Sequence, residues 1–131
     1  AAVGRGALGL ALLSAAWAAQ AGCPLPSDAP DSASAGPVQA RWTTEPATVQ
    51  VGEPFVLKVE LCPATAQLVG VDASMPEHRH GMNYKPSFNP LGEGLWRVEG
   101  MVWHMAGRWA LKLDAVLEGV PHQLTPSVVL K

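Results

Sequence analysis

The chain has 131 residues, with twelve prolines, thirteen glycines and a formal net charge of −2. This length suits one domain, and the abundance of proline and glycine favours short strands joined by turns over long helices. The sequence has no basic stripe that could displace counterions from phosphates, which argues against nucleic-acid binding.

Residues 1–21 have the pattern of a secretory signal peptide. Arg5 precedes a short apolar run, and the small residues Ala19 and Ala21 mark a cleavage position ahead of Gly22. The alternative is a membrane anchor, but the apolar run is shorter than the ~20 residues that span a bilayer. We therefore expect export, to the periplasm or a similar compartment, and loss of Arg5 would change the net charge from −2 to −3.

The two cysteines of the sequence, Cys23 and Cys62, leave two alternatives open. An exported chain with an even number of cysteines often forms a disulfide. Cys23 also follows small residues, as lipid-attachment sites do, although Gln20 stands where such signals usually carry leucine or another aliphatic residue. Contact with a membrane is expected only if Cys23 is lipidated.

Residues 22–38 are rich in proline, serine and alanine, which predicts a flexible spacer. The folded domain is expected over residues 39–131, where apolar and polar residues alternate and no helical stripe is present. Strands are expected at about residues 39–44, 55–61, 67–73, 95–104, 108–117 and 123–130. Six or seven strands of this length predict an all-β fold, an antiparallel immunoglobulin-like β-sandwich, with a small closed barrel as the alternative.

The strand expected over residues 95–104 alternates, which places Trp96 and His104 on one face and Met101 on the other, with Gly100 as a candidate bulge. Four tryptophans are expected to fill the core rather than to contact a ligand, because large aromatics are how small sandwiches fill their interiors. They are Trp42, Trp96, Trp103 and Trp109.

The long segment 74–94 carries the densest group of potential metal donors. Its prolines and glycines argue against a continuous strand, and a long loop in a small domain is often functional. His78 and His80 are two residues apart, so in an extended segment their side chains point to the same side. Glu77 and Arg79 would then share the opposite side and pair with each other.

A second pair of donors, His104 and Met105, follows further along the chain. Thioether and imidazole suit copper(I), whereas zinc in proteins takes cysteine, histidine and carboxylate. We therefore predict a copper site in which Cu(I) is favoured, and its candidate ligands are His78, His80, Met82 and His104, with Met105 as an alternate. Met75 and Met101 are expected to pack, and His122 is expected at the surface.

The stretch Asp72-Ala73-Ser74-Met75-Pro76-Glu77-His78-Arg79-His80-Gly81-Met82, together with Gly100-Met101-Val102-Trp103-His104-Met105-Ala106-Gly107-Arg108-Trp109, resembles the FixH-like/YtkA-like group of exported domains. The resemblance covers roughly residues 51–117. It implies an immunoglobulin-like sandwich outside the cytoplasm, linked to copper handling or respiratory-oxidase assembly. The expected partners are thus a copper ion and a membrane-bound oxidase or copper-transport protein.

The donor pattern is also similar to that of periplasmic copper chaperones of the PCuAC kind, which use a methionine, a gap and a His-x-Met. The gap between Met82 and His104 is similar to theirs. This chain departs from that pattern, because Met105 follows His104 directly and Val71 stands where the upstream histidine is expected.

Together these observations predict a non-enzymatic exported copper-binding protein that acts as a chaperone, a buffer or a metallation accessory. The alternative is a structural or assembly module without metal that binds a protein partner through the 74–94 loop. An enzyme is not expected, because no spacing resembles a nucleophile elbow or an acid–base pair. A blue-copper site is not expected either, since Cys62 lies upstream of the histidines and is followed by Pro63.

Overall fold

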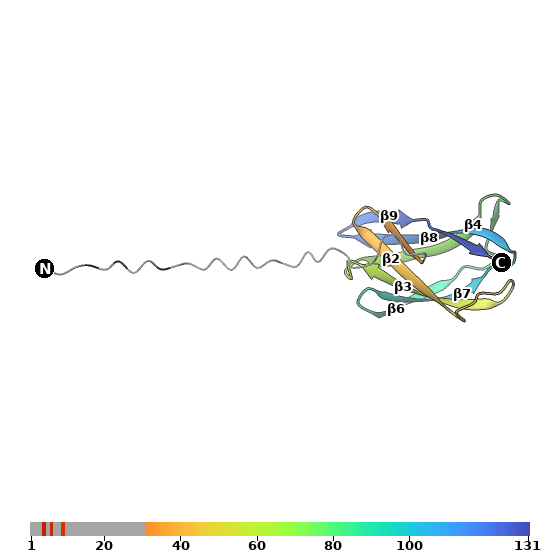
Figure 1. The fold of residues 1–131 in the computed structure, drawn as a ribbon, viewed down its shortest axis with the longest axis horizontal. Coiled ribbons are helices and arrows are strands. Elements are labelled where there is room, and N and C mark those ends of the chain that lie inside the picture. Colours follow the sequence, from red (N-terminus) through yellow and green to blue (C-terminus); the bar gives the residue numbers. More distant parts are fainter. Residues whose placement is uncertain (1–3, 5, 7–8, 10–30) are drawn as a thin grey trace.

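The computed structural model describes residues 31–131, together with Gly4, Gly6 and Gly9. The predicted signal peptide is thus almost wholly outside the described residues, as are Cys23 and residues 22–30 of the predicted spacer. The described part of the chain is all-β and consists of two antiparallel sheets that lie face to face (Figure 1). This confirms the antiparallel sandwich that the alternation predicts. No described segment is a helix long and apolar enough to cross a membrane.

The first sheet has the strand order β1-β2-β3-β7-β6. Its strands are β1 (Ser32–Ala35), β2 (Val38–Glu45), β3 (Pro54–Cys62), β7 (Leu95–Val102) and β6 (Ser87–Gly92). The strand β1 lies within the segment that composition assigns to the spacer, because it pairs with β2 along its whole length. Residues 32–35 therefore belong to the sheet.

The second sheet has the order β10-β8-β4-β5, and β9 also pairs with β8. Its strands are β10 (Ser127–Leu130), β8 (Gly107–Leu117), β4 (Gln67–Met75), β5 (His80–Gly81) and β9 (Val120–Leu124). The single last strand expected over residues 123–130 is thus two strands, divided at Thr125 and Pro126. Each of them pairs with a different half of β8.

The core lies between the two sheets and is filled by the inward residues of the alternating strands. In β3 every second residue from Phe55 to Leu61 is buried, and in β8 the same holds from Trp109 to Ala115. Burial of these side chains is the main stabilising contribution to such a fold. The four tryptophans expected in the core are all buried.

The alternation in β7 reverses at Gly100. This glycine has a φ of 81°, and the register between β3 and β7 shifts at the same place, as in a β-bulge. Met101 and Trp103 consequently point into the core together with Trp96. Strict alternation placed Met101 on the face opposite to Trp96, and this part of the prediction is wrong because the extra residue inverts the pattern.

The segment 74–94 is more ordered than its prolines and glycines suggest. The strand β6 within it pairs with β7 and forms the edge of the first sheet. The prediction that this segment is a long loop is therefore wrong for residues 87–92. Pro90 is tolerated there because an edge strand does not need every backbone N–H for the ladder.

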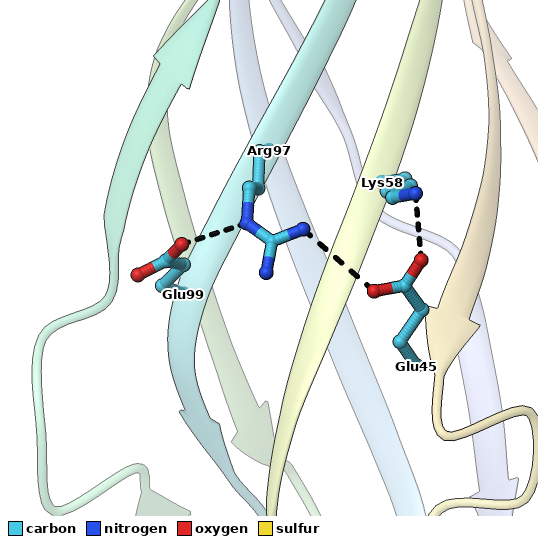
Figure 2. A network of polar contacts seen from close by, with 4 residues as sticks. All are labelled: Glu45, Lys58, Arg97 and Glu99. Atoms are coloured by element: carbon cyan, nitrogen blue, oxygen red, sulfur yellow. Dashed lines mark hydrogen bonds and ion pairs between the residues drawn. The ribbon is translucent and has the colours of Figure 1, made fainter. Parts of the chain in front are cut away.

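The outward face of the first sheet carries a chain of ion pairs, which we call the surface network: Glu45, Lys58, Arg97 and Glu99. Figure 2 shows Arg97 between the two carboxylates, 2.7 Å from Glu99 and 3.7 Å from Glu45. Lys58 lies 2.6 Å from Glu45, and its hydrogen bond is the main reason why the pKa of Glu45 is lowered. The hydrogen bond to Glu99 likewise raises the pKa of Arg97. Every member of this network thus has a partner of opposite charge.

Candidate metal centre

The first group of donors lies in a tight turn between β4 and β5. The backbone N–H of His78 donates to the carbonyl of Met75 over 3.1 Å, and Arg79 adopts a left-handed φ of 52°. The chain then folds back, so that His80 pairs with Met75. This segment is not extended, which corrects the geometry that the His-x-His spacing suggested. The rings of His78 and His80 are nevertheless stacked, with centroids 6.4 Å apart.

The second group of donors lies in the turn that joins β7 to β8. The ring of His104 in this turn is 6.0 Å from the ring of His80, measured between centroids, and the two rings are nearly perpendicular. The fold therefore brings together the two stretches that the sequence separates by more than twenty residues. His78 and His80 are exposed, whereas His104 is half-buried.

Trp109 packs against His104, and Trp103 packs against Trp109. Trp109 makes an edge-to-face contact with the His104 ring at 5.5 Å and stacks on Trp103 at 5.6 Å. The indole N–H of Trp109 donates to the carbonyl of Met105 over 3.0 Å, which holds the turn against the core. The Nδ1 atom of His104 is buried and has no hydrogen-bond partner among the described residues.

The methionines near the histidines differ in burial. Met82, next to β5, and Met105, in the turn, are partly buried and pack against the core. Met75 is completely buried, with an exposed fraction of 0%, as is Met101 in β7. Both were expected to pack, and the structure places both of them in the core.

An ion pair fastens the turn between β4 and β5, residues 76–79, to β8. We call this segment the histidine-bearing turn, because it carries His78. Glu77 accepts a hydrogen bond of 2.6 Å from Nε of Arg108, and Nη1 of Arg108 donates to Ser127. The hydrogen bond from Arg108 lowers the pKa of Glu77. The predicted pairing of Glu77 with Arg79 is therefore wrong, because the left-handed turn at Arg79 replaces the extended segment on which it depended.

One more histidine and one cysteine of the described residues lie away from these two turns. His122 is in β9, opposite Ala115 at the far end of β8, and its ring lies close to Gly36. It is half-buried rather than fully at the surface. Cys62, at the end of β3, is disulfide-bonded. The only other cysteine of the sequence, Cys23, lies outside the described residues.

Among the described residues, no three histidine, cysteine, aspartate or glutamate side chains are grouped so as to hold a metal ion by themselves. Pairs of imidazoles do have suitable spacing. An ion about 2 Å from each of two imidazole nitrogens would separate the ring centres by roughly 5–6.5 Å, and the observed separations are 6.0 and 6.4 Å. A complete site here would have to include thioether ligands, which soft ions accept.

Three residues that the sequence did not assign to the site support the donors. Gly107, Arg108 and Trp109 come two to four residues after Met105. Gly107 leaves room for the end of Met75, Arg108 donates to Glu77, and Trp109 donates to the carbonyl of Met105. Their position next to a donor pair was visible in the sequence. Their contacts were not, because Glu77 and Arg108 are 31 residues apart.

Comparison of the chain with protein-family models, with curated proteins and with solved structures gives no match. The resemblance to the FixH-like/YtkA-like group therefore stays a prediction from motifs. The case for a function depends on the geometry around His80 and His104.

Proposed function

We propose that this protein is an exported copper-binding protein, a chaperone, buffer or metallation accessory. In this proposal copper binds where the turn after β4 meets the turn before β8, and the candidate ligands are His78, His80, Met82, His104 and Met105. The single observation that carries the proposal is the pair His80 and His104, whose rings lie 6.0 Å apart although they come from different turns.

The unpaired ring nitrogen of His104 supports its assignment as a ligand. A buried polar atom without a hydrogen bond costs about 1–3 kcal/mol, and Nδ1 of His104 is such an atom among the described residues. Coordination of an ion would satisfy it. The contact with Trp109 fixes the ring at the same time, so the ligand would be preorganised.

The donor types favour copper over zinc. Met82 lies two residues after His80 and Met105 directly follows His104, so thioethers are close to the imidazoles along the chain, and no cysteine of the described residues is free. Copper(I) accepts thioether and imidazole, whereas structural zinc sites use cysteine and histidine.

The exposure of the turn supports transfer rather than permanent storage. His78 and His80 are exposed, so a ligand of another protein can approach the ion from that side. We propose a membrane-bound oxidase or a copper-transport protein as the partner that receives or delivers the ion. In this proposal the role is non-enzymatic, because the side chains of the two turns would serve as ligands of the ion.

The test is an anaerobic titration of the purified protein with Cu(I) against a chromogenic Cu(I) chelator. The double variant His78→Ala/His80→Ala should bind at least about 100-fold more weakly, since loss of an outer-shell partner alone costs about 10–100-fold in affinity. The matched control is His122→Ala, which removes the remaining histidine at the far end of β8 and should bind as the wild type does.

Equal binding by the wild type and the double variant would contradict the proposal. If the double variant also lost binding to a protein partner while metal content stayed unchanged, the 74–94 segment would instead act as an assembly module.

A further inference from the structure

Met75 lies in the same row of the second sheet as His80. The two residues are directly opposite each other in the β4–β5 pairing, and opposite residues of an antiparallel pair project to the same face with Cβ atoms about 4.5–5.5 Å apart. The last pair of the β4–β8 register is Ser74 with Ala110, so one step further Met75 stands level with Trp109. Met75, His80 and Trp109 thus form one row across β8, β4 and β5.

His104 lies over this row from the other turn. Its ring contacts the rings of both end members, at 6.0 Å from His80 and 5.5 Å from Trp109. Met75, the middle member, is therefore placed between the residues that His104 touches. Its side chain is fully buried.

The end of the Met75 side chain lies where a side chain on residue 107 would be. A Cβ atom on Gly107 would lie 2.7 Å from the terminal methyl carbon of Met75, which is closer than real Cβ contacts. The methionine side chain thus reaches under the turn that carries His104 and Met105. The φ of 132° at Gly107 is one that other residues rarely adopt.

From this placement we infer that Met75 is a thioether ligand of the proposed copper site, and that it binds the ion beside His80 and beneath His104. The inference rests on the proposed function and deepens it. A buried thioether favours a soft monovalent ion, so the site should take Cu(I) and discriminate against Zn(II). Met82 and Met105 are only partly buried, and they would then bind the ion while it enters the site or is exchanged.

The test compares two fully buried methionines. Met75→Leu and Met101→Leu both conserve volume and should cost less than ~1.5 kcal/mol in stability. Titration with Cu(I) should show affinity reduced about 10-fold or more for Met75→Leu and unchanged for Met101→Leu. Titration with Zn(II) should show weak binding to the wild type and no further loss in Met75→Leu.

X-ray absorption at the copper edge supplies a readout that does not depend on affinity. The wild type should show Cu–S scattering at ~2.3 Å, a typical metal–sulfur distance, and Met75→Leu should have less of it. The double variant Met82→Leu/Met105→Leu should keep a Cu–S contribution. Unchanged scattering in Met75→Leu together with its loss in the double variant would overturn the inference.

Failure of the inference and failure of the proposed function are distinguishable. If Met75→Leu binds Cu(I) as the wild type does while His78→Ala/His80→Ala does not, Met75 is only a core residue and the copper site stands. If both variants bind as the wild type does, neither statement holds. Should Met75→Leu fold poorly, the scattering of the double variant still decides the question.

Discussion

Two groups of side chains in the described part of the chain differ in how they are built. The surface network on the first sheet consists of alternating charges, and each of its members has a partner within 4.0 Å (Figure 2). The cluster around His104 consists of imidazoles and thioethers, and the buried Nδ1 of His104 has no partner among the described residues. The first cluster is complete without a ligand, whereas the second has unused donor capacity.

This difference separates a structural role from a binding role. Exposed ion pairs contribute little to stability, and in the surface network the attraction is shared among side chains that water also solvates. Around His104 the neighbouring rings are an imidazole and an indole, and the rings of His80 and His104 lie 6.0 Å apart. A cluster that is incomplete by itself is the better candidate for a ligand site.

The largest expected effect in this comparison comes from Gly107→Ala. The added methyl would force the end of Met75 to move and would strain the backbone at a φ of 132°. The free energy of unfolding should therefore fall by about 1–3 kcal/mol. Gly119→Ala is the matched control, because Gly119 has a φ of 77° but open space around its Cβ position. Thermal or urea unfolding measures both, and equal losses would show that Met75 is not tightly held.

Arg108→Gln should have an intermediate effect, mainly on copper affinity. It removes the ion pair that fastens the histidine-bearing turn, so His78 and His80 would be less well positioned. We expect roughly threefold to tenfold weaker Cu(I) binding. Because Arg108 and Glu77 are 40% and 55% exposed, stability should change little.

The control for that experiment is Arg97→Gln in the surface network. It breaks an ion pair of similar length on the other sheet, 2.7 Å against 2.6 Å. Copper affinity should be unchanged in this variant. If both variants weakened copper binding equally, the anchoring role of Arg108 would be refuted.

The smallest expected effect is the pH dependence that the surface network gives to the free energy of unfolding. The pKa of Glu45 is lowered in the folded protein, chiefly by the hydrogen bond from Lys58. Its contribution to stability is therefore fully present above the unfolded value of ~4.3 and is lost as the pH falls through the lowered folded pKa. Glu45→Gln should be slightly less stable than the wild type at pH 7, and this gap should close in strong acid.

Urea denaturation at pH 7 and pH 3, in low and in high salt, measures the difference in the free energy of unfolding between the wild type and Glu45→Gln. Salt should reduce this difference at pH 7, since exposed pairs are screened. A gap that grew in acid would contradict the assigned sign.

Much of the fold could be predicted because it is encoded locally. The alternation of Phe55 to Leu61 and of Trp109 to Ala115 placed two central strands and their buried faces. Where the prediction was wrong, the cause was not local. Gly100 signalled a bulge, but only pairing with β3 determined that Met101 turns inward, and β6 exists because β7 offers it an edge.

By itself, the sequence determined the all-β class, most strand positions, the tryptophan core and the two stretches of donors. Residue periodicity and composition are enough for these features, because each depends on neighbours along the chain. Only the tertiary structure decided that His80 and His104 lie 6.0 Å apart, that Glu77 pairs with Arg108, and that Met75 reaches under Gly107. Those contacts join the ends of β4 and β8 with the turns beside them, and the pairing of β4, β5 and β8 within the second sheet, not the local pattern, sets the distances between them.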